Sequence, residues 1–340
     1  QERRSQEGQC QEGRPLARLE SIERLVLDDT LRQPLTAPHV AYLKIADGCD
    51  RLCSFCAIPA IRGRFVSKPL ETIVGEARKL AENGVKELVL IAQETTFYGS
   101  DLYGKPRLAE LLERLETVAG IRWIRLMYAY PLFFGDELLE RFAAAGTKLL
   151  PYIDMPLQHA NDTILKRMRR GIDRAGMEAL LERLRSNIPN LVLRTSLIVG
   201  FPGETEAMFD ELVAFVKRWR FDRAGIFPFS SEAGTVAARL DGHVPQSVID
   251  LRFRKLQNLQ RRIMNRFAAA RTGKTLDVLI DGPVVEDDGN PVENVFVGRT
   301  YADAPEVDPL VYVTGHAEVG AIVPCEIVDA RDGNLIGVVS

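Results

Sequence analysis

The sequence predicts an α/β protein: a partial TIM-type (β/α)6 barrel followed by a small all-β, OB-like barrel. Two observations predict this fold class. Between residues 40 and 229, short apolar runs alternate six times with longer amphipathic segments. From Lys274 onward, short alternating runs are separated by turn residues such as Asp-Gly and Gly-Asn. Repeated strand–helix units require parallel strands with helices outside, and right-handed crossovers curl such a sheet into a full or partial barrel.

Each expected strand of the larger domain is a short apolar run, at 40–46, 86–91, 121–127, 149–155, 191–199 and 223–229. The helices expected between them cover 72–83, 108–118, 136–145, 175–186 and 206–219. Glycines such as Gly84, Gly120 and Gly146 follow three of these segments, where a helix commonly ends in a left-handed residue. In barrels of this kind the functional residues lie on the loops after the strands. We therefore expect the site at that edge.

The same patterns divide the chain into four segments. Residues 1–38 are polar and are expected to be a poorly ordered leader or linker. Residues 39–245 form the larger domain, and residues 246–272 form a basic connecting helix with no acid after Asp250. The small barrel covers 273–340, with strands expected at 275–280, 295–297, 310–313, 321–323 and 336–339 and turns at Asp281-Gly282, Asp288-Gly289-Asn290 and Asp332-Gly333-Asn334.

Charge is distributed unevenly along the chain. The 340 residues carry a net charge of −3, yet residues 273–340 contain 13 acids and 3 bases, a net charge of −10. Such a domain repels phosphate backbones and attracts a basic partner. No signal-peptide pattern is found, and no apolar run reaches the length of about 18 residues that a membrane span needs. We expect a cytoplasmic protein with no membrane partner.

Three cysteines follow the first expected strand at CxxxCxxC spacing: Cys49, Cys53 and Cys56. Thiolates are soft ligands that suit iron–sulfur clusters, and three of them can hold three corners of a 4Fe-4S cluster. A structural zinc site would need a fourth Cys or His, and His39 is poorly placed for it. A disulfide would leave an odd thiol, and a ferredoxin usually uses four cysteines per cluster.

The motif resembles that of the radical S-adenosylmethionine superfamily, in which an aromatic residue, here Phe55, precedes the last cysteine. The resemblance implies that the three thiolates bind the cluster and that its open iron binds S-adenosylmethionine. It further implies contacts to S-adenosylmethionine from the ends of later strands. These candidates are Phe55, Gln93, Glu94, Gln158, Arg194, Gly200, Pro202 and Gly203. Two have structural alternatives: an ion pair for Arg194, and a plain strand-to-helix turn for Gly200 to Thr205, with Glu204 near the helix start. His159 could also touch ribose or substrate, although a hydrogen-bonded loop histidine is the ordinary case.

Further motifs are similar to those of methylthiotransferases of the RimO type. They are Tyr42 to Cys49, Ile58 to Gly63, Ala92 to Gly99, Asp101 to Gly104, Pro156 to His159 and Val199 to Thr205. This resemblance implies a methylthio group added to the β-carbon of an aspartate in ribosomal protein S twelve, an external electron donor and a C-terminal TRAM domain. The transfer-RNA enzymes of the family, MiaB, usually carry an Asn-Val-Asn-like run where Thr95 to Tyr98 stands here. The acidic barrel likewise suits a basic ribosomal protein better than RNA, although RNA binding stays open.

One family feature has no counterpart in these residues. The family carries an N-terminal domain with three more cysteines for a second 4Fe-4S cluster, and nothing before Val40 resembles it. Cys10 lies in the polar leader, and Cys325 is expected to be a small buried thiol. We therefore expect a fragment that cleaves S-adenosylmethionine without completing sulfur insertion. A transfer-RNA methylthiotransferase and a non-catalytic, metal-pinned binding module are the alternatives. Arg62, Arg64 and the basic run Lys166 to Arg170 are candidates for holding the target aspartate.

Overall fold

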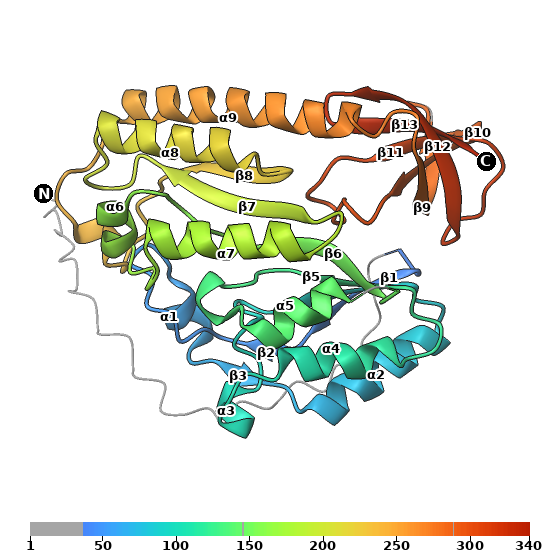
Figure 1. Cartoon of the computed structure of the whole chain (residues 1–340), viewed down its shortest axis with the longest axis horizontal. Helices are drawn as coiled ribbons and strands as arrows, with labels where there is room; N and C mark the ends of the chain where they lie inside the picture. Colours follow the sequence, from blue (N-terminus) through green and yellow to red (C-terminus); the bar gives the residue numbers. More distant parts are fainter. Residues whose placement is uncertain (1–36, 145, 288) are drawn as a thin grey trace, which may run out of the picture.

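Six parallel strands form the main sheet of this computed structural model, which describes residues 37–144, 146–287 and 289–340. Their order in space is their order in sequence (Figure 1): β1 (Val40–Lys44), β4 (Glu87–Ile91), β5 (Trp123–Leu126), β6 (Leu149–Asp154), β7 (Val192–Val199) and β8 (Arg223–Pro228). The predicted partial barrel is confirmed, with every expected strand present. The proposed leader falls almost wholly outside the described residues.

Helices cover the outer face of this sheet: α2 (Leu70–Glu82), α4 (Leu108–Glu116), α5 (Asp136–Ala143), α7 (Arg174–Asn187) and α8 (Glu206–Trp219). Strand side chains alternate between two faces, and Leu43, Leu90 and Leu126 point outward into the helix layer with less than 1% exposure. Short elements that the sequence analysis did not predict lie in the connections: β2 (Ala46–Asp47), β3 (Val66–Ser67), α1 (Ile58–Arg62), α3 (Ser100–Tyr103) and α6 (Asp162–Arg167).

Helix α8 shows how the sequence sets an element. Thr205 caps its start by accepting a hydrogen bond from the Met208 amide, a contact of a kind that stabilises helices by about 1 kcal/mol. Phe209, Leu212, Phe215 and Val216 recur at helical spacing and are buried against the sheet. Each such side chain contributes roughly 1.5–3 kcal/mol on burial. The predicted bounds 206–219 are confirmed because cap and periodicity agree.

The C-terminal residues close into a five-stranded barrel in the order β10-β11-β13-β12-β9. Its strands are β9 (Thr275–Val285), β10 (Pro291–Arg299), β11 (Val311–Thr314), β12 (Ile322–Arg331) and β13 (Asn334–Val339). All five predicted strands are present. The turn expected at Asp281-Gly282 is wrong, because β9 runs through both residues with a register shift opposite Val297 and Gly298. Asp332 and Gly333, by contrast, have the positive φ values of a tight hairpin turn.

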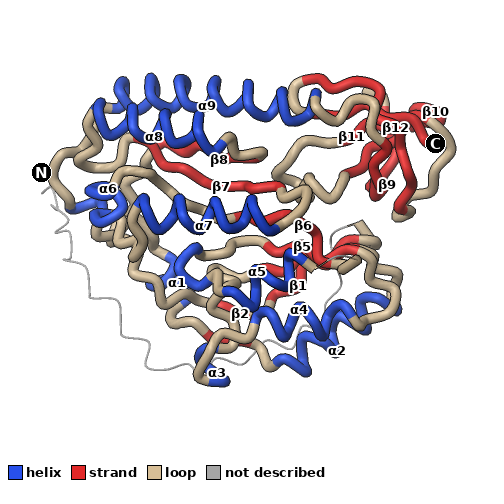
Figure 2. The backbone as a smooth tube through the Cα atoms, in the orientation of Figure 1, coloured by secondary structure: helices blue, strands red, loops and turns tan. Residues whose placement is uncertain are grey.

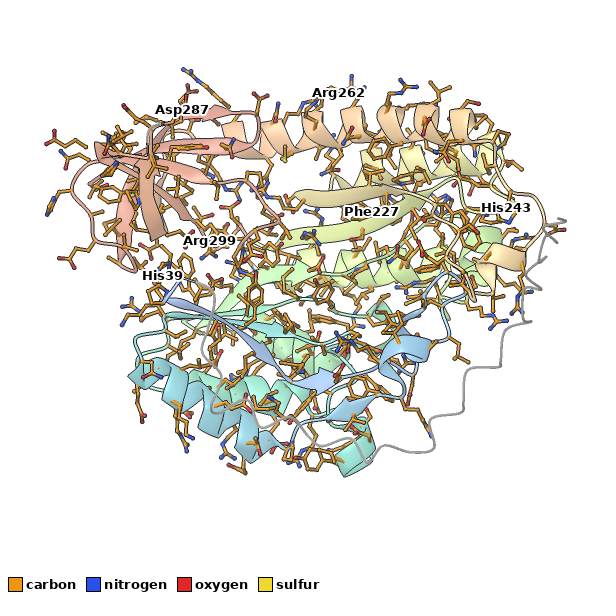
Figure 3. The ribbon with its side chains drawn as sticks, turned by 180° about the vertical axis from the view of Figure 1, so that it is seen from behind. His39, Phe227, His243, Arg262, Asp287 and Arg299 are labelled. Atoms are coloured by element: carbon orange, nitrogen blue, oxygen red, sulfur yellow. The ribbon has the colours of Figure 1, made fainter. Side chains whose placement is uncertain are left out.

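The small barrel packs against the amino ends of the parallel strands. Glu87 at the start of β4 accepts hydrogen bonds from Arg125 (2.7 Å) and from Arg299 of the barrel (2.6 Å). Arg299 also donates to Asp281, which contacts His39 at 3.0 Å. Figure 3 labels Arg299 and His39 at this junction. We call the buried and half-buried charges at this junction the interdomain seam: His39, Glu87, Arg125, Arg194, Arg223, Asp281, Arg299, Asp303 and Asp308.

The predicted basic helix is α9 (Gln246–Ala269), which at 1.5 Å per residue is about 36 Å long. It lies beside α8 and runs to the small barrel (Figure 2). Its first turns pack Ile249 onto Gly200 after β7, and its last turn puts Ala268 into the barrel core. The helix therefore joins the carboxyl end of the sheet to the barrel at the amino end. Among the described residues, no helix has the length and apolarity that crossing a membrane requires.

Candidate active site

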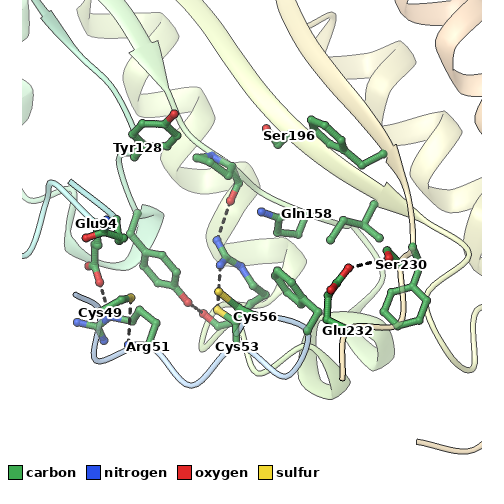
Figure 4. A pocket seen from close by; sticks show the side chains of 18 of the residues that line it. Cys49, Arg51, Cys53, Cys56, Glu94, Tyr128, Gln158, Ser196, Ser230 and Glu232 are labelled. Atoms are coloured by element: carbon green, nitrogen blue, oxygen red, sulfur yellow. Dashed lines mark hydrogen bonds and ion pairs between the residues drawn. The ribbon is translucent and has the colours of Figure 1, made fainter. Parts of the chain in front are cut away.

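A cavity of about 520 Å³ lies at the carboxyl edge of the parallel sheet (Figure 4). It is lined by residues that follow five of the six strands and by Ser196 and Ile198 within β7, near the edge where the fold predicts the site. These are Cys49, Arg51, Cys53, Phe55, Cys56, Gln93, Glu94, Tyr128, Ala129, Tyr130, Pro156, Gln158, Arg170, Ser196, Ile198, Phe227, Pro228, Phe229, Ser230 and Glu232. Seven of the predicted residues therefore meet in one place, the three cysteines among them.

The cysteine loop turns into this cavity immediately after β2. Gly48 has φ +75°, which opens the loop, and the Cys56 amide donates to the Cys53 carbonyl at 3.1 Å. Cys49 is buried, while Cys53 and Cys56 are half-buried. Burial raises the pKa of the Cys49 thiol to about 11 and raises that of Cys56 as well. Binding a metal here would displace thiol protons, as metal binding by thiols generally does.

The thiols fit a cluster better than a single ion. Across the described ranges, no three His, Cys, Asp or Glu side chains are arranged to hold one metal ion. A zinc ion would draw its ligands to within about 2.3 Å of one centre. In a 4Fe-4S cluster each thiolate binds a different iron, so the sulfurs stay further apart. The three thiols and the adjoining cavity suit the cluster. The zinc alternative is disfavoured because the thiols do not converge on one centre and no fourth ligand lies nearby in the described residues.

Two acceptors beside the cysteines lack partners in the described structure. Glu94 is 1% exposed and accepts from Arg51 at 2.6 Å through Oε2, yet its Oε1 has no hydrogen-bond donor. The Oε1 of Gln93 is also buried without a donor. Burial raises the pKa of Glu94 even though the Arg51 guanidinium opposes the shift. Buried acceptors of this kind call for a donor, and the ammonium group of an amino-acid ligand would supply one.

Arg170 is a site residue that the sequence analysis did not assign to this role. Its guanidinium donates to Cys53 Sγ at 3.3 Å and to the Pro156 carbonyl at 2.6 Å, and it stacks 4.3 Å from the Tyr130 ring centre. Its Nε is buried without an acceptor in the described part of the chain. Arg170 ends the basic run that was predicted to hold the target aspartate. Its contact with Cys53 becomes visible only in the three-dimensional structure.

Arg51 is a second missed cation, placed inside the cysteine motif itself. Its guanidinium lies 4.2 Å from the Phe133 ring centre and 4.6 Å from that of Phe97. The two aromatic rings hold it against Glu94. Across the cavity, Ser230 donates to Glu232 at 2.7 Å. Neither residue belongs to a sequence motif, so neither was predicted as a site residue.

Gln158 and Phe55 both line the cavity, and their contact with a ligand stays a prediction. Gln158 has φ +73°, and its amide donates to the Ser196 carbonyl at 2.8 Å, so the loop after β6 is fixed against β7. Its neighbour His159 is buried away from the cavity, where Nδ1 accepts from the Asn161 amide at 3.0 Å and Nε2 lies 3.4 Å from Glu204. The histidine is thus the ordinary hydrogen-bonded case.

Four of the residues predicted to contact the ligand, Arg194, Gly200, Pro202 and Gly203, do not line this cavity. Arg194 does face the barrel interior, but it pairs with Asp154 at 2.8 Å and lies 3.6 Å from Asp308. A Cβ on Gly200 would come within 2.4 Å of Ile249, so this glycine permits the approach of α9 and not of a ligand. The Gly203 amide donates to the Gly242 carbonyl at 2.7 Å.

The remaining candidates lie outside the cavity. Arg64 is 90% exposed, and Arg62 lies 3.9 Å from Asp47. Within the basic run, Arg167 pairs with Asp241, which leaves Arg170 as its cavity member. Cys325 is buried in the small barrel as expected, and Cys10 lies outside the described residues.

Comparison with known families agrees with this geometry. Residues 43–216 match the radical SAM superfamily, and residues 272–339 match the TRAM domain. The chain is 47% identical over 313 residues to the ribosomal protein uS12 methylthiotransferase RimO of Microcystis aeruginosa, covering 92% of this chain and 70% of that protein. The chain belongs to the RimO family of radical SAM enzymes. RimO of Lachnoclostridium phytofermentans is 44% identical, covering 91% of this chain and 69% of the relative.

The match does not extend over the whole of these relatives. RimO of Myxococcus xanthus is 46% identical over 88% of this chain, which corresponds to 61% of that protein. The fold also matches coproporphyrinogen III oxidase (HemN) of Escherichia coli, a radical SAM enzyme, with a TM-score of 0.51 and 18% identity, covering 81% of this chain and 69% of HemN. At that identity the match shows the shared fold alone.

Proposed function

We propose that this chain generates a radical from S-adenosylmethionine and directs it to an aspartate of ribosomal protein uS12. The supporting observation is the cavity, where three thiols and three unpartnered buried polar atoms, on Gln93, Glu94 and Arg170, face a common space. The relatives named above are uS12 methylthiotransferases. The substrate printed for these relatives favours a ribosomal protein over transfer RNA, and we propose the same substrate class for this chain.

In this proposal Cys49, Cys53 and Cys56 hold the 4Fe-4S cluster. When bound, the cluster would supply the single electron needed to cleave S-adenosylmethionine reductively, the chemistry by which a hydrogen atom would be taken from the aspartate β-carbon. Glu94 and Gln93, which line the cavity, would accept hydrogen bonds from the methionine ammonium, and Gln158 would contact the nucleoside. Arg170 donates to the Cys53 sulfur, and the aromatic rings around Arg51 exclude water from Glu94. We further propose that an external donor provides the electron and that the protein acts in the cytoplasm.

The small barrel supports binding of a basic protein. Three of its carboxylates, Asp281, Asp303 and Asp308, are used in the interdomain seam. Eight others are exposed: Asp277, Glu286, Asp287, Glu293, Glu306, Glu318, Glu326 and Asp332. No described barrel residue lines the cavity, which opens at the opposite end of the sheet. The barrel would therefore recruit the substrate at a distance from the chemistry.

Anaerobic reconstitution with iron and sulfide tests the proposal. We expect the reduced protein to show a paramagnetic cluster signal that changes when S-adenosylmethionine is added, and to release 5′-deoxyadenosine. A cluster signal that ignores S-adenosylmethionine would favour a metal-pinned binding module instead. Mass spectrometry of a uS12 peptide after the same reaction reports whether these 340 residues also complete methylthio transfer. Glu94→Gln serves as the control, because it keeps the three thiols and changes only the proposed acceptor for the methionine ammonium.

A further inference from the structure

The outer side of α9 carries a row of arginines that the proposed chemistry does not use. The helix has no acid after Asp250, and the seven bases of residues 246–271, of which Arg271 follows the helix, separate into two groups. Arg252 is buried against Glu204 (2.8 Å), Arg271 packs on the Phe267 ring at 3.3 Å, and Lys255 pairs with Asp210 at 3.1 Å. These three bases have structural partners.

The other four, Arg254, Arg261, Arg262 and Arg266, are exposed and form no ion pair with any described acid. We call them the α9 ridge. Arg254 contacts the Asp250 carbonyl at 3.2 Å and Arg261 the Asn258 side chain at 2.6 Å, both neutral groups of the same helix. Arg262 lies on the outer edge of the molecule (Figure 3). From Arg254 to Arg266 the ridge spans about 18 Å on one side of the helix.

The position of the ridge suggests its partner. It lies between the carboxyl end of the sheet, which bears the cavity, and the acidic barrel at the amino end. A partner that reaches both ends must itself extend over about 36 Å, the length of α9. A basic ribosomal protein alone would be attracted by the barrel and repelled by the ridge. RNA phosphates have the opposite preference, so RNA-bound ribosomal protein complements both surfaces.

We propose that the α9 ridge binds the phosphate backbone of ribosomal RNA, so that the enzyme takes its protein substrate with RNA attached. This rests on the proposed function for its biological meaning, although the contact itself can be measured without it. Arginine is suited to phosphate because its planar guanidinium donates two parallel hydrogen bonds. Four such contacts give binding that depends on salt and not on base sequence.

The test is the binding of a labelled ribosomal RNA hairpin to the chain, followed by fluorescence anisotropy over a range of salt. Four neutralised phosphates give a slope of log affinity against log salt of about −3.6 on a duplex. Affinity should then fall roughly 100-fold between 50 and 200 mM salt. Replacing all four ridge arginines by glutamine should abolish most of this slope and weaken binding at least about tenfold at 50 mM.

A matched variant removes the same charge from the far side of the molecule, by glutamine substitution of the exposed Arg78, Lys79, Lys105 and Arg122. It should keep the slope of the unsubstituted chain. Equal slopes for the ridge variant and the unsubstituted chain would overturn the proposal. So would ridge-dependent binding to polyglutamate or to anionic vesicles without binding to RNA. Because the assay needs neither cluster nor S-adenosylmethionine, failure of the radical chemistry leaves its result unaffected.

Discussion

Buried charge occurs in two regions of this molecule, and the two regions differ in how completely their acceptors are used. In the interdomain seam both oxygens of Glu87 receive a guanidinium, and both oxygens of Asp281 are bonded by Arg299 or His39. In the cavity, Glu94 uses one oxygen and the side-chain carbonyl of Gln93 accepts nothing. The seam's carboxylates are satisfied, and its unpaired buried atoms are nitrogens, His39 Nδ1 and Arg223 Nε, whereas the cavity leaves two buried oxygens without donors, which indicates a place for a ligand.

The largest effect should come from the thiols. Replacing Cys49, Cys53 and Cys56 together by alanine removes all three cluster ligands, so we expect complete loss of bound iron and of visible cluster absorption after anaerobic reconstitution. Cys325→Ala should retain both, because that thiol is buried in the small barrel. Iron retained by the triple variant would exclude the cluster assignment.

Breaking the seam should destabilise the fold without altering the cavity. Glu87→Gln leaves two buried guanidiniums facing a neutral amide, and losing one partner of a buried ion pair typically costs about 3–5 kcal/mol. Urea denaturation measures the change in free energy of unfolding. Asp329→Asn, at a partly exposed pair with Arg331, should change it by less than about 0.5 kcal/mol. Equal effects for the two variants would show that the seam is not structural.

The reverse pattern is expected for Glu94. Glu94→Gln should weaken S-adenosylmethionine binding about 10- to 100-fold, or about 1.4–2.7 kcal/mol, because the ammonium loses a charged acceptor. Calorimetric titration of the loaded protein measures this. Glu76→Gln provides the matched control, since Glu76 is equally buried but pairs with Lys68 away from the cavity. That variant should lose stability and keep affinity; an identical profile for both glutamates would make Glu94 structural.

Arg170 should have a smaller, electronic effect. Removing its hydrogen bond to Cys53 Sγ would leave the sulfur more electron-rich and the cluster harder to reduce. Hydrogen bonds to the sulfurs are one of the factors that set the reduction potential of a cluster. We expect Arg170→Met to lower the midpoint potential by up to about 60 mV, a tenfold change for a one-electron couple. Arg167→Met, which removes a cation paired with Asp241, should leave the potential unchanged in the same spectroelectrochemical titration.

The smallest effect should be on how stability depends on pH. Burial opposes the shift, but hydrogen bonds from His39 and Arg299 lower the pKa of Asp281. Its contribution to stability is therefore complete above the unfolded pKa of about 3.9 and is lost as the pH falls through the lower folded value. Asp281→Asn should differ most from the unsubstituted chain near neutral pH, and the two should converge in acid. Parallel stability curves down to pH 2 would contradict this.

The fold and the centre of the site could be predicted because their signals are local. Helical periodicity and the Thr205 cap define α8, and spacing alone identifies the three cysteines. The missed and misassigned residues depend on contacts distant in sequence. Arg170 meets Cys53 across 117 positions, and Arg194 meets Asp308 across 114. Asp281-Gly282 resembles a turn, yet its register shift is set by the opposing strand β10. Gly200 resembles a ligand-approach glycine, but the side chain that needs the space belongs to α9.

The interdomain seam also limits how the two domains can be recombined. A chimera that exchanged only residues 273–340 would remove Arg299 and Asp303, which would leave Arg223 without its carboxylate and Glu87 with Arg125 alone. Transplanting the recognition barrel of another enzyme would thus require matching side chains at the strand starts. A hybrid would first have to pack its new barrel against the strand starts, and only a correctly packed hybrid could bind a different substrate.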